Sequence, residues 1–413
     1  MAAGRALGLG PLLLLSLWGA SAPASLLRRL GEHVRRLRDS SSPGPNPGPA
    51  AAALPAEGWL QQALDPFNAS DGRSFLQRYW VNDRHWASRD GPVFLHLGGE
   101  GSLGPGAVMR GHPAALAPAW GALVIGLEHR FYGLSIPAGG LDTAQLRFLS
   151  SRHALADVVS ARLALSRLLN VSSSSPWVCF GGSYAGSLAA WARLKFPHLI
   201  FAAVASSAPV RAVLDFSAYN EVVSRSLTST AIGGSPEVVL HGLGQKCLSF
   251  SRAETVAQLR VTEPQVSSVG DRQWLYQTCT EFGFYVTCED PRCPFSQLPA
   301  LPSQLELCEQ VFGLSTSSVA QAVAQTNSYY GGQTPGSTQV LFVNGDADPW
   351  HVLSVTQALG PSVSALLIPS ASHCLDMAPE RPSDSPNLRL GRQSIFQQLR
   401  TWLRVDTRIR AGL

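Results

Sequence analysis

The chain has 413 residues, of which 45% are hydrophobic and 15% are charged, so it can bury a sizeable core and is not a disordered protein. Its formal net charge is only +4, and no stretch interleaves basic and aromatic residues, which argues against nucleic acid as a partner. No segment repeats at a period of about 20–50 residues, which excludes solenoids and propellers.

The N-terminal residues have the features of a secretory signal peptide. Arg5 supplies a positive charge, an apolar stretch includes Leu12 to Leu17, and Ala20-Ser21-Ala22 offers a cleavage site. We therefore expect residues 1–24 to be removed and the protein to follow the secretory route to endosomal or lysosomal vesicles. The apolar run is too short to cross a bilayer and no later run reaches about 18 residues, so no membrane span is expected.

Residues 25–56 are expected to be a linker or a pro-like segment. They include Ser41 to Pro49, a stretch in which prolines and glycines alternate with few other residues, and such a stretch does not form regular structure.

From Trp59 onward, apolar segments alternate with segments of helical periodicity. Strands are predicted at 78–81, 92–97, 122–127, 177–180 and 201–205, and helices at 154–169 and from the residue after Ser183 to Phe196. Because the strands are apolar on both faces, the predicted fold class is α/β, with a doubly wound and mainly parallel sheet. Residues 57–209 form the first part of this domain.

The alternation stops after Pro209 and resumes near the C-terminus. Residues 210–335 are polar and helical, and we predict that they form a cap inserted over the carboxyl edge of the sheet, where ligands bind in such folds. Strands at 340–343 and 365–368 and a helix at 394–403 complete the domain over residues 336–405. Residues 406–413 are expected to be a tail.

The seven cysteines indicate disulfides in an oxidising compartment. Five of them lie between Cys247 and Cys308, and the odd total leaves at least one thiol unpaired. A zinc site is the alternative, but no C-x-x-C pair is present, so no metal is expected. The sequons at Asn68 and Asn170 are candidate glycosylation sites and fit the same route.

The sharpest chemical signal is the segment from Phe180 to Gly186, Phe-Gly-Gly-Ser-Tyr-Ala-Gly. A predicted strand enters it and a predicted helix leaves it, which is the context of a nucleophile elbow with Ser183 as the nucleophile. Small residues must flank the serine, and Gly181 and Ala185 meet this need, with alanine in place of the usual second glycine. The alternative is an ordinary glycine-rich turn between a strand and a helix.

A serine nucleophile requires a base and an acid, which in this fold follow it in the order acid, histidine. Four histidines follow Ser183, and of these His373 comes directly after the last predicted strand. The acid should follow the preceding strand, where the loop offers Asp346 and Asp348, and position alone does not choose between them. His351 in the same loop is expected to cap or to face solvent. In an acidic vesicle His373 must stay neutral to act as a base, so we expect burial to lower its pKa.

The oxyanion hole requires two backbone N–H donors. Tyr184, next after the nucleophile, supplies one, and the glycine-rich loop after the strand at 92–97 is expected to supply the other, with Gly99 the favoured donor. The alternative is that these glycines only form a turn.

Five ordered motifs give the chain a family resemblance. They are Gly98-Gly99-Glu100-Gly101, the segment from Glu128 to Gly133, the elbow, Asn344 to Trp350, and His373 to Met377. Together they resemble the prolyl carboxypeptidase and dipeptidyl peptidase II family of serine peptidases over about residues 57–403. The resemblance implies an α/β-hydrolase domain with a helical cap, no cofactor, and cleavage of peptides after a small or proline residue near one end.

The resemblance also implies residue roles. It assigns the acid to Asp348 and the base to His373, and it places Trp350 and Glu100 at the substrate pocket. It suggests a Cys279–Cys308 disulfide, and a scaffold role for Glu128, Arg130 and Tyr132. Peptide processing in endosomes for T-cell selection and a homodimer are further expectations.

One departure from the family is the short cap, part of which is missing, as in an alternative splice product. Cys247 and Cys288 are then expected to have lost their partners. Two other functions therefore stay open: an esterase on the same fold, and a cap-truncated variant with weak or no activity.

Overall fold

The computed structural model describes residues 55–228, 251–264, 270–289, 293, 300–360 and 362–410. The predicted signal peptide, nearly all of the predicted linker and Cys247 lie outside the described residues. Both halves of the predicted sheet and much of the predicted cap lie within them.

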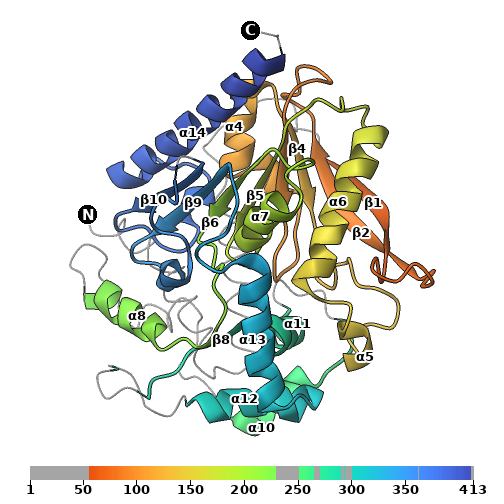
Figure 1. The fold of residues 1–413 in the computed structure, drawn as a ribbon, viewed down its shortest axis with the longest axis vertical. Coiled ribbons are helices and arrows are strands. Elements are labelled where there is room, and N and C mark those ends of the chain that lie inside the picture. Colours follow the sequence, from red (N-terminus) through yellow and green to blue (C-terminus); the bar gives the residue numbers. More distant parts are fainter. Residues whose placement is uncertain are drawn as a thin grey trace.

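Eight strands form one sheet in the order β1-β2-β4-β3-β5-β6-β9-β10 (Figure 1). The strands from β4 to β10 in this order run parallel, whereas β1 and β2 form an antiparallel ribbon along one edge. Their bounds are β1 Ala56–Ala63, β2 Ser74–Asn82, β3 Val93–Leu97, β4 Leu123–Leu127, β5 Trp177–Gly182, β6 Ala202–Ser206, β9 Val340–Gly345 and β10 Val363–Ile368. The predicted doubly wound, mainly parallel sheet is confirmed.

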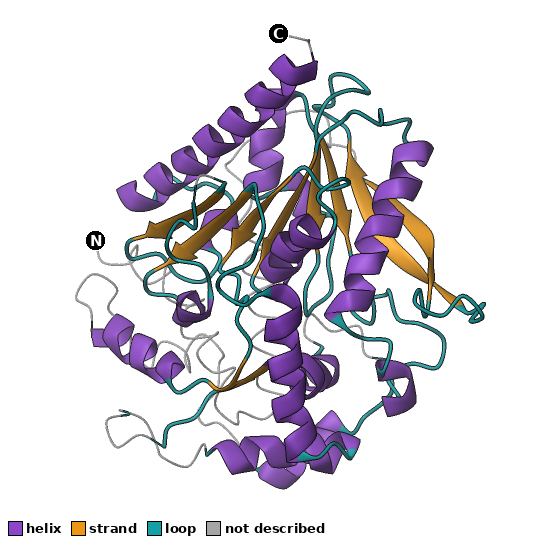
Figure 2. Ribbon diagram, in the orientation of Figure 1, coloured by secondary structure: helices purple, strands orange, loops and turns teal. Residues whose placement is uncertain are grey.

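Helices cover both faces of this sheet (Figures 1 and 2). Helices α6 and α7 pack on one face, and α4 and α14 pack on the other. The helices of this domain are α3 Gly106–Met109, α4 His112–Trp120, α5 Thr143–Leu146, α6 Ser151–Leu168, α7 Tyr184–Lys195 and α14 Pro386–Arg410, with short 3-10 turns at Pro349–Leu353 and Leu375–Met377.

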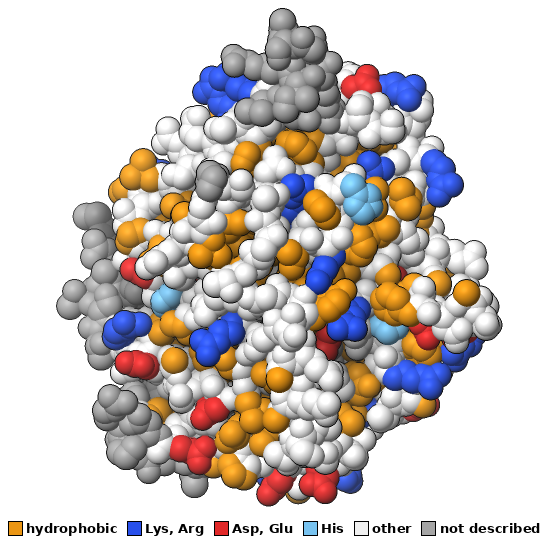
Figure 3. Space-filling model, viewed as in Figure 1, with side chains coloured by type: hydrophobic (Ala, Val, Ile, Leu, Met, Phe, Trp, Pro, Cys, Tyr) orange, Lys and Arg blue, Asp and Glu red, His pale blue; other side chains and the backbone are white. Residues whose placement is uncertain are grey.

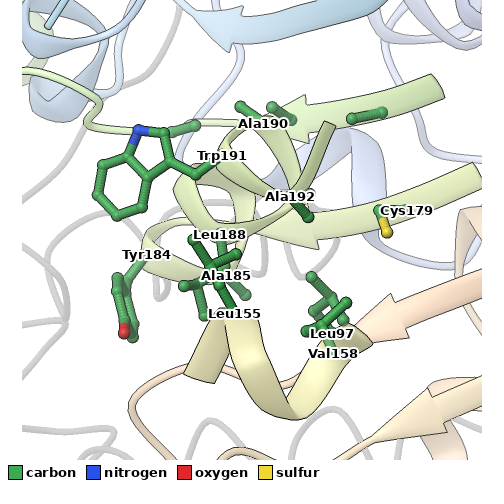
Figure 4. Packing of buried hydrophobic residues seen from close by; sticks show 14 of the residues in the cluster. Leu97, Leu155, Val158, Cys179, Tyr184, Ala185, Leu188, Ala190, Trp191 and Ala192 are labelled. Atoms are coloured by element: carbon green, nitrogen blue, oxygen red, sulfur yellow. The ribbon is translucent and has the colours of Figure 1, made fainter. Parts of the chain in front are cut away.

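The strands read as continuous apolar runs because successive side chains enter two different cores. In β3, Leu95 and Leu97 face the core beneath α6 and α7, whereas Phe94 faces the core beneath α4 and α14. Figure 4 shows part of the first core, including Leu97, Val158 of α6 and Leu188 of α7. Burying each such side chain stabilises the fold by about 1.5–3 kcal/mol. Because the sheet is packed on both faces, the ends of its strands are held in fixed positions.

The segment between β6 and β9 forms the predicted helical insertion. It contains α8 Ala218–Thr228, α10 Arg252–Leu259, α11 Asp271–Gln277, a π-helical turn at Thr278–Phe282, α12 Leu301–Phe312 and α13 Thr316–Tyr330. It also contains a two-stranded parallel sheet of β7 Val213–Asp215 and β8 Gly283–Tyr285, which the sequence did not indicate. In Figure 1 the helices α10 to α13 lie together beyond one end of the large sheet.

Two disulfides join residues of the insertion. The Cys279–Cys308 bridge suggested by the family resemblance is present. The expectation that Cys288 has lost its partner is wrong, because it is bonded to Cys293. The two residues are five positions apart with their Cα atoms separated by 5.5 Å, which is within reach of a bridge, so the partner is a local one.

These elements make an α/β-hydrolase fold. In the described part of the chain, no helix is long and apolar enough to cross a membrane. On the face seen in Figure 3, basic and acidic side chains are scattered among uncharged ones.

Candidate active site

Ser183 lies in a sharp turn between β5 and α7. Its backbone has φ 60° and ψ −132°, a conformation that non-glycine residues adopt only under strain. Its N–H donates to the Ser206 carbonyl at 2.9 Å, which ties the turn to β6. A Cβ on Gly181 would lie 2.1 Å from the Ala185 carbonyl oxygen, so a side chain does not fit there. This is the geometry of a nucleophile elbow, and it explains the small residues around the serine.

Asp348 and His373 are hydrogen-bonded to each other. Asp348 follows β9 and is fully buried, and its Oδ1 lies 2.9 Å from His373 Nδ1. The same oxygen accepts a bond from the Trp350 N–H at 3.0 Å, which orients the carboxylate. Because a carboxylate only accepts, the neutral imidazole has its proton on Nδ1 and a lone pair on Nε2, the tautomer that a general base requires.

The pKa of His373 shifts in the direction opposite to the expected one. Burial acts to lower this pKa, as expected, but the charge and hydrogen bond of Asp348 act with the adjacent Cys374 side chain to outweigh it. The pKa of His373 is therefore raised well above its ordinary value of 6.5. The sequence-based expectation considered desolvation alone and did not include the close carboxylate.

The two aspartates of the loop after β9 have different partners. Asp346 is exposed, and its Oδ1 accepts a bond from the Ser370 N–H at 2.6 Å. His351 Nδ1 is bonded to the Asp348 carbonyl at 2.5 Å and so caps the local turn. The structure therefore brings Asp348, and not Asp346, to the imidazole.

The loops that carry Ser183 and His373 are in direct contact. A Cβ on Gly182, just before Ser183, would lie 2.9 Å from Sγ of Cys374, just after His373. The Cys374 N–H donates to Ser207 Oγ at 2.9 Å. Within the described residues, Ser183 Oγ itself makes no hydrogen bond to His373. Such bonds are often long in an enzyme without substrate and shorten when the reacting complex forms.

The backbones of the loops that carry Asp348 and His373 are in close contact. A Cβ on Gly345, at the end of β9, would lie 2.1 Å from the Ala371 carbonyl oxygen. That oxygen also accepts a bond from the Ala347 N–H at 3.2 Å. Glycine at position 345 therefore sets the spacing between Asp348 and His373.

The glycine-rich loop after β3 lies against the first turn of α7. A Cβ on Gly99 would lie 3.4 Å from the Ala185 nitrogen, in van der Waals contact. Tyr184 is the first residue of α7, where N–H groups have no partner inside the helix. The amides of Gly99 and Tyr184, both expected oxyanion donors, thus belong to two neighbouring backbone segments.

The two expected pocket residues lie beside the base. The Trp350 ring centroid is 6.4 Å from that of His373 and 5.2 Å from that of Phe284, and the side chain is buried. Burial raises the pKa of Glu100, while the charge of His373 acts in the opposite direction. The carboxyl group of Glu100 is thus within electrostatic reach of the imidazole.

The segment from Glu128 to Gly133 mostly holds the scaffold together. Arg130 is fully buried and pairs with Asp157 of α6 through Nε at 2.7 Å and through a terminal nitrogen at 2.6 Å. Glu128 accepts bonds from Arg78 at 2.9 Å and from the Ser135 hydroxyl at 2.7 Å. These two charged groups bind neighbouring segments rather than the elbow.

Sequence reasoning missed two side chains near the elbow. His129 Nε2 and Gln277 Nε2 both bond the Tyr184 hydroxyl, at 3.0 and 2.9 Å. His129 lies inside a motif that was recognised as a unit, whereas Gln277 lies in the insertion, where nothing in the sequence marks it.

The other expected features lie away from the elbow. Asn68 and Asn170 are both exposed in turns, where a glycan could be attached. Within the described residues, no group of three or more histidine, cysteine or carboxylate side chains could hold a metal ion.

Comparisons with known proteins identify relatives along almost the whole chain. It is 67% identical to the thymus-specific serine protease of Homo sapiens over 504 aligned residues, covering 98% of each chain. It is 26% identical to the lysosomal Pro-X carboxypeptidase of Homo sapiens, covering 97% of each. Among solved structures, a carboxyl esterase from the fungus Tuber melanosporum matches with a TM-score of 0.43 and 11% identity, over 90% of this chain and 96% of the other.

The first alignment is longer than the chain, 504 against 413 residues, so the relative contains residues that this chain lacks. The model of the serine carboxypeptidase S28 family matches residues 62–239 and 234–395, two segments that meet inside the predicted cap. On these matches, the chain belongs to the serine carboxypeptidase S28 family and is a serine peptidase.

Proposed function

We propose that the protein hydrolyses peptides through an acyl-enzyme formed on Ser183. The hydroxyl oxygen attacks the peptide carbonyl while His373 Nε2 takes its proton and then gives it to the leaving amine. A water molecule, deprotonated by the same nitrogen, releases the acyl group. Asp348 holds the imidazole tautomer, and the amides of Tyr184 and Gly99 stabilise the oxyanion. The observation that carries this proposal is the 2.9 Å bond between Asp348 and His373 at the edge where Ser183 turns.

The test is labelling by a fluorophosphonate probe. Ser183→Ala should abolish labelling, because the probe reacts only with an activated serine. Ser187→Ala is the matched control: Ser187 is buried one turn further along α7, and among the described residues its hydroxyl has no hydrogen-bond partner. Labelling should persist in the control, and labelling that also persists in Ser183→Ala would refute the assignment.

For the substrate, we propose peptides cut near one end, after a small or proline residue. The support is family membership and similarity to a protein named lysosomal Pro-X carboxypeptidase, together with the aromatic ring of Trp350 beside His373. A panel of aminoacyl-proline peptides, each blocked at the N- or the C-terminus, would identify the end that is cut. Turnover of simple esters with no turnover of any peptide would favour the esterase alternative.

For the setting, we propose the secretory route and endosomal or lysosomal vesicles, with peptide processing for T-cell selection as the role. The support is the N-terminal sequence, the exposed sequons and the lysosomal relatives. Active-site titration of the purified glycoprotein tests the opposing view that the shortened cap leaves it inactive. A stoichiometric burst on a chromogenic ester would reject that view, and no burst would support it.

A further inference from the structure

The side chain of Tyr184 is held by contacts with the insertion. Tyr184 directly follows Ser183, and its buried ring extends from the start of α7 (Figure 4). Its ring centroid lies 5.7 Å from that of Trp274 and 5.4 Å from that of Phe282, both in the insertion. Side chains of the insertion therefore pack against Tyr184, the residue whose backbone N–H we assign to the oxyanion hole.

The protons around the Tyr184 hydroxyl can be assigned from the neighbouring histidine. His129 Nδ1 lies 2.7 Å from the Arg130 carbonyl oxygen, which only accepts, so Nδ1 carries the proton. Burial lowers the pKa of His129 to about 4, so the ring is neutral and Nε2 accepts. The Tyr184 hydroxyl, 3.0 Å from Nε2, therefore donates to it.

Gln277, at the end of α11, completes the chain of hydrogen bonds. Its Nε2 donates to the Tyr184 oxygen at 2.9 Å, and its Oε1 accepts from the Tyr132 hydroxyl at 2.6 Å. The amide also contacts the carboxylate of Glu281. Gln277 is fully buried, and its two ends have opposite hydrogen-bonding roles, so the network admits one amide orientation.

We propose that Gln277 is a positioning residue for the oxyanion hole. It fixes the far end of the Tyr184 side chain, and with it the first turn of α7 and the direction of the Tyr184 N–H. An apolar side chain of similar size would fill the same volume, so packing alone does not require a buried amide here. This role rests on the proposed acyl-enzyme mechanism, and it assigns a catalytic task to the part of the cap that the chain retains.

The test compares Gln277→Leu and Tyr184→Phe with Gln273→Leu. The last variant is a matched control, because Gln273 lies on the same helix and bonds the Phe131 carbonyl instead of Tyr184. Each variant is titrated with the fluorophosphonate so that rates refer to folded sites. The readouts are kcat, KM, and the inhibition constants of a peptidyl boronic acid, which mimics the oxyanion, and of a product peptide.

We expect Gln277→Leu and Tyr184→Phe each to lower kcat and boronate affinity about tenfold, less than the effect of losing an oxyanion donor outright. KM and product affinity should stay within about twofold. Adding Gln277→Leu to Tyr184→Phe should cost little more, because both break the same contact. The control should leave the boronate affinity unchanged.

Unchanged boronate affinity in Tyr184→Phe would overturn the inference, and so would additive losses in the double variant or an equal loss in Gln273→Leu. Tyr184→Phe keeps the ring and its packing, so it carries the test even where Gln277→Leu fails to fold. The proposed acyl-enzyme mechanism has a separate test: it is refuted if the fluorophosphonate still labels the Ser183→Ala variant.

Discussion

The sheet and the insertion hold their residues in place by different means. In the sheet, parallel strands buried on both faces end at one edge, and Ser183, Asp348 and His373 each follow a strand there. The insertion has short helices, a two-stranded sheet, two disulfides and polar contacts to the domain beneath it. One such contact is Glu281 with the Ser151 N–H at the start of α6, at 2.9 Å.

This difference suggests a division of labour. Reaction geometry depends on the sheet, whose side chains cannot move without opening a close-packed core. Fine adjustment depends on the insertion, whose contacts are fewer and partly polar. Changes at the sheet edge should therefore abolish turnover, and changes in the insertion should alter stability, pH response or the degree of catalysis.

The largest effect is expected at the sheet edge. Asp348→Asn should lower kcat by about 10⁴-fold, because an amide in place of the carboxylate stabilises the wrong imidazole tautomer. Asp346→Asn, in the same loop, is the control and should retain turnover, since the Asp346 carboxylate bonds only the Ser370 N–H among the described residues. Steady-state kinetics on one peptide would measure both, and equal losses would reject Asp348 as the acid.

Beneath the elbow, Arg130→Met should lower the free energy of unfolding by about 3–5 kcal/mol, because it leaves the buried Asp157 carboxylate unpaired. The matched change in the insertion is Glu306→Gln, which breaks a 3.7 Å pair with Arg252 near the surface. That change should cost less than about 1 kcal/mol. Urea denaturation would measure the free energy of unfolding of both variants. Similar decreases would contradict the proposed difference between the sheet domain and the insertion.

Within the insertion, the disulfide that closes the longer loop should contribute more to stability. Replacing Cys279 and Cys308 by alanine should destabilise the protein by about 3.5 kcal/mol, since their bridge closes a loop with a separation of 29 residues. Replacing Cys288 and Cys293, five residues apart, should cost about 2 kcal/mol. Thermal denaturation would rank the two, and limited proteolysis should locate the first opening in the insertion.

The contact between the insertion and α6 should be sensitive to pH. Burial raises the pKa of Glu281 to about 7, although the Ser151 hydroxyl and amide act to lower it. A carboxyl group with a raised pKa gives its full stability below the unfolded value of 4.5 and loses it as the pH rises through 7. We expect a loss of about 3 kcal/mol over this range, and Glu281→Gln should flatten it. Melting temperatures of the unchanged protein and of Glu281→Gln should be measured from pH 4 to 8. The same dependence on pH in both proteins would show that this assignment is wrong.

Turnover should depend on pH in the opposite sense. The base must be neutral, and the pKa of His373 is raised, so kcat/KM should fall about tenfold per pH unit as the solution becomes acidic below that pKa. Acidic conditions thus favour the docked insertion but disfavour the base. A rate that stays flat between pH 5 and 7 would contradict the raised pKa.

The sequence predicted the sheet well where strands were continuous apolar runs, as in β3 to β6. It missed β1, whose residues are mostly exposed, because that strand is held by pairing with β2 rather than by burial. It also shortened α14, which begins at Pro386 and ends at Arg410 rather than spanning 394–403. Polar helical turns at a surface leave little periodic signal.

For the site, the nucleophile elbow could be predicted from the sequence because its strained turn requires small residues at fixed positions. The choice between Asp346 and Asp348 needed the family resemblance, since both lie in the same loop. The contacts of His129 and Gln277 with Tyr184 could not be predicted, because these residues lie 55 and 93 positions away from it in the chain. Short-range patterns contain no information about such pairs.

The contact between Gly345 and Ala371 has a consequence for how the enzyme can change. A single methyl group at position 345 would lie 2.1 Å from the backbone oxygen of Ala371 and would push the two loops apart. In a saturation library selected for turnover, this position should accept glycine alone. The loops that carry Asp348 and His373 must therefore change together.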